Sequence, residues 1–247
     1  MTTLLEEREL EVEVAHNVRH LAGYETRHGS RTHARDIIRS ASLHRLTENG
    51  IGTLYDTGVR TVVDFRSDQE REREATPDMG RWGIKNVHAP VFNGDASPAG
   101  LARDSFPGYS HVYRRFLDIG ADAYRTLFET VADAEGAVVF HCAAGKDRTG
   151  VAAALLLDLG GATDDAIVAD YRHTETLLKP LIPEWLPKMQ ERGINEERAH
   201  QLLAAPEEAI RTALETVREQ HGGAEGYLRH LGLSTTAISA VRARIAE

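Results

Sequence analysis

The stretch from Ala137 to Leu159 constrains the fold of this chain more than any other segment. It begins with the most apolar run of the sequence, Ala137–Cys142, continues through a loop containing Gly145 and Gly150, and ends in the apolar segment Val151–Leu159. A buried strand that is joined by a tight glycine loop to a buried helix is the building unit of sheets covered by helices. We therefore expect an α/β fold.

Strands and helices alternate before this stretch, and only helices follow it. Runs rich in β-branched residues predict strands at 59–66 and 86–91, in addition to 137–142. The segment 93–108 is rich in Gly, Pro, Asp and Ser, which indicates a mobile loop. Apolar spacing and capping signals predict helices at 47–58, 67–74 (with Ser67 and Glu70 as a capping box), 109–131 (interrupted near Gly120), 151–159, 164–174, 196–203, 206–220 and 234–247.

The length of 247 residues fits one elaborated domain over 1–247. We expect a sheet core over about 14–160 and a helical region over about 161–247 that could cover a site as a lid. No apolar run of about 18 residues is present and the first residues are acidic, so the sequence predicts no membrane insertion and no secretory signal. A cytoplasmic location is expected, with signal-independent secretion left open.

The charge of the chain limits its partners. Lysine and arginine number 29 against 38 acidic residues, a net charge of −9, which disfavours binding to nucleic acid. Residues 16–45 are an exception, with six arginines and two acidic residues. We interpret this stretch as a solvated basic face, in which Arg19 or Arg39 could help to hold a substrate.

The ten residues from His141 to Gly150, HCAAGKDRTG, carry the chemistry. In a tight loop before a helix, successive backbone N–H groups turn inward and the helix dipole adds positive charge, which makes an anion site. The Gly-Lys-Ser/Thr ending of a nucleotide-binding loop is missing, so a nucleoside triphosphate is not expected. The anion site is predicted to be formed by Ala143, Ala144, Gly145, Lys146, Arg148 and Thr149.

Cys142, the only cysteine of the chain, stands at the start of this 141–150 loop. A single cysteine excludes an internal disulfide and leaves a thiol that is either buried filler or a nucleophile. Inward N–H groups, a helix dipole and two nearby cations are expected to lower the pKa of this thiol to about 3.5–7.5. We therefore predict a thiolate nucleophile in an anion site.

Arg148 follows the cysteine by six positions, and its planar guanidinium can hold two oxygens of a tetrahedral oxyanion above the sulfur. This arrangement predicts attack on a phosphate monoester, a cysteinyl-phosphate intermediate and its hydrolysis by water, with no metal and no other cofactor. A carboxyl group must protonate the leaving oxygen. The sequence offers Asp64, at the end of the strand 59–66, and Asp147, within the loop, as alternatives.

The pattern His141-Cys142-x5-Arg148-Thr149-Gly150 resembles the signature loop of protein tyrosine phosphatases. Its Gly-Lys-Asp-Arg variant resembles a bacterial tyrosine/lipid phosphatase subgroup, and the resemblance covers nearly the whole chain. Val18 and His20 depart from the opening motif of that subgroup. Further segments that fit in order and spacing are Asn17-Val-Arg19, Arg39-Ser40, Asp64-Phe-Arg66-Ser67, Ala169-Asp170-Tyr171 and Gly226-Tyr-Leu228.

This resemblance implies the cysteine-phosphatase fold, with a central, mostly parallel sheet of four to five strands, flanking helices and an all-helical C-terminal extension. It implies that Cys142 is the nucleophile, that Arg148 clamps phosphate, that Thr149 hydrogen-bonds the cysteine sulfur and that His141 orients the loop. Phosphate and vanadate are expected as inhibitory ligands. Supporting roles fall to Arg19, Arg39 and Ser40.

Four functions compete on this evidence. The first is hydrolysis of phosphotyrosine in proteins, with dual specificity as an extension. The second keeps the mechanism but takes a phosphoinositide, because Lys146 adds a cation beside Arg148. A rhodanese-like sulfurtransferase is disfavoured, since its loop is one residue shorter between cysteine and arginine. A non-catalytic phosphate-binding module would require that no general acid be present.

Overall fold

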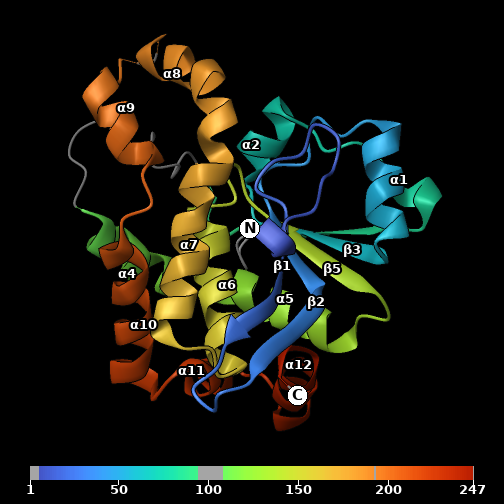
Figure 1. The fold of residues 1–247 in the computed structure, drawn as a ribbon, viewed down its shortest axis with the longest axis vertical. Helices are drawn as coiled ribbons and strands as arrows, with labels where there is room; N and C mark the ends of the chain where they lie inside the picture. Colours follow the sequence, from blue (N-terminus) through green and yellow to red (C-terminus); the bar gives the residue numbers. More distant parts are fainter. Residues whose placement is uncertain (1–5, 94–107, 192, 247) are drawn as a thin grey trace.

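The computed structural model describes residues 6–93, 108–191 and 193–246, and within these it contains one five-stranded sheet (Figure 1). The strand order is β1-β2-β5-β3-β4, in which β1 is antiparallel to β2 and the other neighbours are parallel. The strands are β1 (Arg19–Glu25), β2 (Arg31–Ser40), β3 (Val59–Asp64), β4 (Lys85–His88) and β5 (Ala137–His141). The expected α/β fold with a mostly parallel sheet is confirmed.

Helices cover both faces of the sheet, because successive residues of each strand point to opposite sides. Val62 and Val139 pack with α1 (Glu48–Asp56), whereas their neighbours Val63 and Val138 belong to the larger core on the other face. The other described α-helices are α2 (Asp68–Arg73), α4 (Tyr109–Ile119), α5 (Ala121–Asp133), α6 (Asp147–Leu159), α7 (Asp164–Leu178), α8 (Ile182–Glu191), α9 (Glu196–Leu203), α10 (Glu207–His221), α11 (Ala224–His230) and α12 (Thr235–Ile245).

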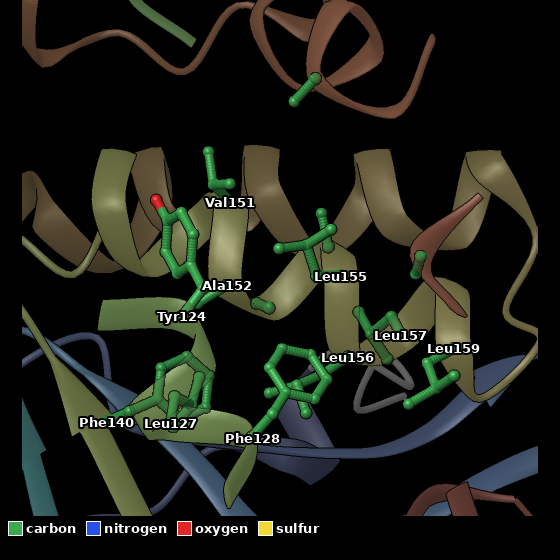
Figure 2. Close-up of a cluster of buried hydrophobic side chains, with 14 of the residues drawn as sticks. Tyr124, Leu127, Phe128, Phe140, Val151, Ala152, Leu155, Leu156, Leu157 and Leu159 are labelled. Carbon is green, nitrogen blue, oxygen red and sulfur yellow. The ribbon is translucent and has the colours of Figure 1, made fainter. Parts of the chain in front are cut away.

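Helix α6 is the centre of the larger core, and all of its residues are buried. Figure 2 shows its Leu155 and Leu156 close to Phe128 of α5, with Phe140 of β5 in the same cluster. Full burial of one such side chain contributes about 1.5–3 kcal/mol. The 141–150 loop therefore runs between two firmly anchored elements, β5 and α6.

The strand register brings three chain segments to one edge of the sheet. His141, the last residue of β5, lies opposite Ser40 at the end of β2 and opposite Asp64 at the end of β3. The carboxyl ends of parallel strands are where ligands bind in α/β sheets. The segments that the sequence marked for chemistry thus meet at this edge.

Elements with strong local signals are confirmed. Thr47 caps α1, and Ser67 and Glu70 make both hydrogen bonds of the capping box at α2. The helical segment 109–131 is divided at Gly120 into α4 and α5, as predicted. Most of the predicted loop, residues 94–107, lies outside the described residues.

The interpretation of residues 16–45 as a solvated basic face is wrong for Arg19 and Arg39. These two side chains are fully buried, because the stretch forms the β1–β2 pair. Exposed Arg31 there alternates with buried Thr32, which is the period of a strand. A count of charges alone does not reveal that alternation.

Helices α6 and α7 are longer than the sequence predicted, and α8 and α11 were not predicted as separate elements. α6 begins at Asp147 instead of Val151, so the last four of the ten residues 141–150 already form its first turn. α7 continues beyond Thr174 to Leu178, and α8 follows it. Figure 1 shows α8 and α9 beyond the end of α7, away from α11 and α12.

Candidate active site

A pocket of about 260 Å³ opens beside the 141–150 loop. Cys142 and Arg148 of the loop line it together with Glu70 of α2. Leu181 and Trp185, from the segment after α7, line it as well. The pocket therefore combines a charged part at the loop with an apolar part from the C-terminal helices.

Gly145 allows the loop to turn tightly against β2. Its φ of +66° lies in the left-handed region, and an added Cβ would collide with the backbone of Ser40 and Ala41. The backbone N–H of Ser42 also donates to the carbonyl of Ala143 at 2.9 Å. The loop is thus closed onto the end of β2, which explains why glycine is required at this position.

Arg148 is held in place by Glu70. The carboxylate of Glu70 accepts two hydrogen bonds from the guanidinium, at 2.7 and 2.8 Å, and the guanidinium carbon lies 4.9 Å from the centre of the Phe92 ring. Burial opposes the charge of Arg148, but Cys142 and Glu70 outweigh it and raise the pKa of the guanidinium. Glu70, predicted from the sequence only as a capping residue, thus also fixes the plane of the Arg148 guanidinium.

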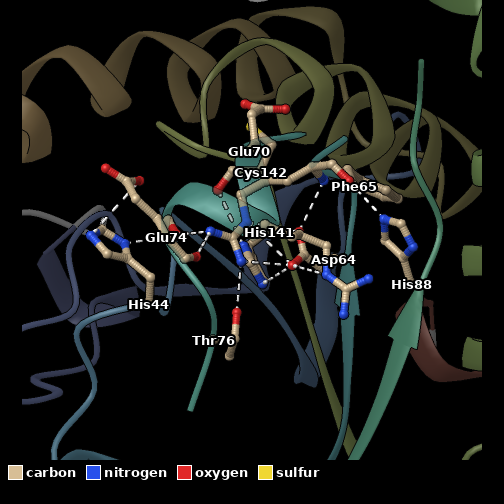
Figure 3. A network of polar contacts seen from close by, with 12 residues as sticks. His44, Asp64, Phe65, Glu70, Glu74, Thr76, His88, His141 and Cys142 are labelled. Carbon is tan, nitrogen blue, oxygen red and sulfur yellow. Dashed lines mark hydrogen bonds and ion pairs between the residues drawn. The ribbon is translucent and has the colours of Figure 1, made fainter. Parts of the chain in front are cut away.

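The two candidate general acids lie in different surroundings. Asp147 lines the pocket, and its Oδ1 accepts a hydrogen bond from the Tyr113 hydroxyl at 2.8 Å. Asp64 is fully buried and does not line the pocket; it accepts hydrogen bonds from the Arg66 side chain at 2.8 to 3.2 Å (Figure 3). Burial raises the pKa of Asp64, but the charges of His141 and Arg66 outweigh it and lower the pKa to about 2. Asp64 is therefore an ionised carboxylate at neutral pH.

His141 lies between Asp64 and the loop. Its Nε2 is 3.8 Å from Asp64 Oδ2, and its Nδ1 is 3.2 Å from the carbonyl oxygen of Cys142 (Figure 3). Burial lowers the pKa of this imidazole, although Asp64 acts in the opposite direction. These contacts fit the predicted role of His141 in orienting the loop.

The predicted hydrogen bond between Thr149 and the sulfur of Cys142 is not made in this structure. Among the described residues, neither Thr149 Oγ1 nor Ser40 Oγ has a hydrogen-bond partner. Both hydroxyls are buried at the loop, Thr149 in the first turn of α6 and Ser40 at the end of β2. The contact from Thr149 stays a prediction for the state with substrate or intermediate bound.

Lys146 does not point its ammonium group to an open anion site. Its Nζ donates to the carbonyl oxygens of Leu202 at 2.5 Å and Ala204 at 2.8 Å, at the end of α9. Its Nζ is also 3.5 Å from Asp147 Oδ1. Lys146 therefore ties the loop to the end of α9, although it also lines the pocket, and its contact with phosphate stays a prediction.

Arg19 and Arg39 are placed behind the loop and not in the pocket. Both contact Asp170 of α7, and Arg39 also donates to the carbonyl of Gly145 at 2.6 Å. Neither is among the described residues that line the pocket, and a contact of either arginine with substrate stays a prediction. Asp170 has no role in the prediction from the sequence, because it is 151 residues from Arg19 in the chain.

The described residues contain neither a metal-binding cluster nor a membrane-spanning helix. No group of three or more His, Cys, Asp or Glu side chains there is arranged to hold a metal ion. No helix in the same part of the chain is long and apolar enough to span a membrane.

The five-stranded, mostly parallel sheet and the loop between β5 and α6 agree with the fold that the resemblance to tyrosine phosphatases implies. The chain matches the tyrosine phosphatase family over residues 10–247, and it belongs to that family. It is accordingly a hydrolase of the protein-tyrosine-phosphatase class.

Individual relatives match most of this chain. A tyrosine-protein phosphatase of Nostoc commune is 28% identical over 225 residues, covering 85% of this chain and 74% of the relative. The triple specificity protein phosphatase PtpB of Mycobacterium tuberculosis is 29% identical over 248 residues, covering 83% of this chain and 89% of the relative. Among solved structures, the core catalytic domain of the PP-IP phosphatase SIW14 from S. cerevisiae is 18% identical, with a TM-score of 0.40 over 66% of this chain and 78% of that chain.

Proposed function

We propose that this protein hydrolyses phosphotyrosine in proteins through a cysteinyl-phosphate formed on Cys142. The observation that carries the proposal is that Cys142, Arg148 and Asp147 line one pocket, each supplied by the 141–150 loop. They offer a nucleophile, an oxyanion clamp and a proton donor for one reaction. Glu70 supports the clamp by fixing its plane.

Phosphate binding uses the donors that remain on Arg148. A guanidinium has five N–H donors, and within the described residues Glu70 takes two and the carbonyl of Phe65, at 3.4 Å, takes a third. The remaining donors can hold two phosphate oxygens in a fork. Because Glu70 has already ordered the side chain, little further rotamer freedom is lost when phosphate binds.

The reaction then follows in two displacements. The sulfur of Cys142 attacks phosphorus, the bond from phosphorus to the tyrosine oxygen breaks, and Asp147 gives its proton to that oxygen. A water molecule next attacks the phosphorus of the cysteinyl-phosphate while the Asp147 carboxylate accepts a proton from it. The sulfur–phosphorus bond breaks, and inorganic phosphate leaves the pocket.

Asp147 is the better general acid in this scheme, although both candidates came from the sequence. It lines the pocket, and the hydrogen bond from Tyr113 fixes its carboxyl group. Asp64 holds no proton near neutral pH, because its pKa is about 2, and it is enclosed by Arg66 and His141. We assign Asp64 to the support of His141.

The apolar part of the pocket favours an aromatic phosphate ester. Ala41, Leu178 and Leu181 form a buried cluster, and Ala144 of the loop and Trp185 pack against it. All five residues line the pocket beside the phosphate site. A tyrosine ring can bury its face against such a surface, whereas the hydroxyls of an inositol ring would lose hydration there.

A phosphoinositide is the second candidate substrate. Arg45, Arg73 and Lys188 line the pocket, which supports a more highly charged ligand. Two of these cations are paired with Glu184, at 2.8 Å each, and Lys146 is bound to carbonyl groups. The relative from M. tuberculosis is named a triple specificity protein phosphatase, so substrate choice in this family needs a direct comparison.

A substrate panel tests the proposal. We expect kcat/KM for a phosphotyrosine peptide to exceed that for a soluble phosphoinositide by about tenfold or more, since burial of an aromatic ring is worth over 1 kcal/mol. Acid quenching during turnover should yield protein phosphorylated at Cys142. A higher kcat/KM for the phosphoinositide would reverse the substrate assignment. Turnover of thiosulfate with no phosphatase activity would mean that the protein is a sulfurtransferase and not a phosphatase.

A further inference from the structure

A group of buried polar side chains lies against the 141–150 loop; it consists of Asn17, Arg19, Tyr24, Arg39 and Asp170, and we call it the Asp170 cluster. Asp170 accepts hydrogen bonds from the Tyr24 hydroxyl at 2.6 Å and from Arg19 Nε at 2.8 Å, and it pairs with Arg39. The side chains of Arg19 and Arg39 are fully buried. No member of the cluster is among the described residues that line the pocket.

The cluster reaches the loop through two backbone carbonyl groups. Asn17 Nδ2 donates to the carbonyl oxygens of Ala144 and Gly145 at 3.0 Å each, and Arg39 Nη2 donates to that of Gly145 at 2.6 Å. Asn17 Oδ1 in turn accepts a hydrogen bond from Arg19. The amide of Asn17 is therefore oriented by one arginine, and it directs its donor group to the loop.

Holding these carbonyls also sets the direction of the loop N–H groups. A trans peptide is planar, and its C=O and N–H point in opposite directions. With the carbonyls of Ala144 and Gly145 turned toward the cluster, the N–H groups of Gly145 and Lys146 are turned away from it. Inward N–H groups of this kind are what binds a phosphate oxyanion in such a loop.

The charge of the cluster acts in the same direction. Burial raises the pKa of the Asp170 carboxyl, but Arg19 and Arg39 outweigh it and hold that pKa well below its usual range. Two guanidinium groups and one carboxylate leave one positive charge in excess behind the loop. Buried charges are weakly screened, so this excess favours an anion on the other side of the loop.

We propose that Asn17 and Arg39, held by Asp170, are positioning residues that aim the N–H groups of Gly145 and Lys146 at the bound phosphate. This inference rests on the proposed function of the same pocket. It replaces the expectation that Arg39 contacts the substrate. Asn17 is suited to the task because its φ of 58° lies in the left-handed region, which asparagine tolerates better than most residues.

The test uses two substitutions at Asn17 in the full-length protein. Asn17→Asp keeps the shape but replaces the donor by a carboxylate, which repels the two carbonyls and cancels the excess charge. Asn17→Gly removes the donor and still accepts the positive φ. The measured quantities are the inhibition constant for vanadate, the rate of Cys142 alkylation as a function of pH, and kcat and KM for an aryl phosphate.

We expect vanadate inhibition to weaken about tenfold in Asn17→Gly and more in Asn17→Asp, as expected for buried acceptors that lose their donor. Alkylation near neutral pH should become slower, because the thiolate loses part of its stabilisation. The drop in kcat/KM should follow the loss of vanadate affinity in both variants.

Arg244→Gln is the matched control. Arg244 also donates to backbone carbonyls, those of Val131, Ala134 and Gly136, but at the C-terminal helix and away from the loop. Its loss should lower the melting temperature and leave vanadate inhibition and thiol reactivity unchanged. If both Asn17 variants behave like Arg244→Gln, or fail to fold, the cluster serves stability alone and the proposal is overturned.

Failure of the proposed function would look different. In that case the wild-type protein itself would lack phosphatase turnover. Thiol alkylation needs no substrate, so the effect of the Asn17 substitutions on the loop would still be measured and would decide this inference on its own.

Discussion

Helices α6 and α8 border the same pocket but differ in how they are anchored. Every residue of α6 is buried, whereas none of α8 is, and α8 carries Pro187 inside it. Segments with few buried side chains open locally at low free-energy cost, and fully buried helices open only with the whole domain. The proposed nucleophile Cys142 and the proposed clamp Arg148 thus belong to the rigid part, and the pocket wall at Trp185 of α8 belongs to the part that opens more easily.

Substitutions in α6 and its loop are expected to affect the chemical step, and substitutions in α8 are expected to affect access to the pocket. Substitutions between β5 and α6 should reduce the chemical step by large factors and leave substrate entry unchanged. Substitutions that loosen α8 and α9 should change substrate entry, the protection of the Cys142 thiol from oxidation and hydrogen exchange in these helices. Their effect on the chemical step should be small. Lys146 belongs to both parts, since it stands in the loop and binds the end of α9.

The largest effect is expected for Cys142→Ser. Loss of the nucleophile should reduce kcat by more than about 10³-fold, as in other enzymes that depend on a covalent intermediate. Inorganic phosphate should still bind, because the backbone N–H groups and Arg148 remain; calorimetry measures this. Residual activity above a few per cent would mean that the rigid part does not supply a covalent nucleophile.

Arg148→Lys comes next, with a loss in kcat/KM of about 10²–10³-fold. An ammonium group keeps the charge but cannot form a fork with two phosphate oxygens or pair with both oxygens of Glu70. Steady-state kinetics with an aryl phosphate give the size of the loss. Glu70→Gln is the companion variant. Its loss of kcat/KM should be smaller than that of Arg148→Lys, since it disturbs only the orientation of the Arg148 guanidinium. A mild effect of Arg148→Lys would place the phosphate site elsewhere.

Asp147→Asn should lower kcat by about 10²-fold for a phenyl or alkyl phosphate, which needs a proton on the leaving oxygen. With an activated nitrophenyl ester the loss should be much smaller. Asp64→Asn is the matched control. It removes a carboxylate outside the pocket, so it should lower kcat by the same factor for both substrates. If Asp64→Asn instead shows the leaving-group dependence, the assignment of the general acid must be exchanged.

Some residues of the candidate site could be predicted from the sequence, and others could not. Cys142 and Arg148 could be predicted because they stand within one short loop whose strand and helix are marked by their own apolar runs. β3 and α2 were equally readable, from a β-branched run and from the capping box of Ser67 and Glu70. Residues and elements that are marked by patterns within one short segment can therefore be predicted from the sequence.

What the sequence did not reveal depends on contacts between distant segments. Arg19 and Arg39 look like surface cations until their partner Asp170 is known, and that partner lies on another helix. The same holds for the contact of Glu70 with Arg148 and for that of Lys146 with α9. Local patterns contain no information on which of several charged residues will meet after folding.

A smaller effect is expected on acid stability. The pKa of Asp64 is about 2 in the folded state and about 3.9 in an unfolded chain. A lowered pKa stabilises the fold above pH 4, and this contribution, about 2 kcal/mol, is lost as the pH falls from about 4 to 2. Urea unfolding of the wild type and Asp64→Asn at several pH values measures it: the variant should be less stable at pH 7, and the difference should shrink in acid. An equal difference at all pH values would contradict the pKa assignment.

The smallest effect on turnover, a few-fold at most, is expected for Lys146→Met, which tests the link between the two parts. Methionine fills a similar volume but cannot donate to the carbonyls of Leu202 and Ala204, so the end of α9 loses two hydrogen bonds to a charged group, each worth about 1.5–3 kcal/mol. Hydrogen exchange should rise in α8 and α9 and stay unchanged in α6, and Cys142 should become easier to oxidise. A loss of kcat/KM comparable to that of Arg148→Lys, with unchanged exchange in α9, would instead return Lys146 to the phosphate site and remove the distinction between the rigid loop and the movable wall.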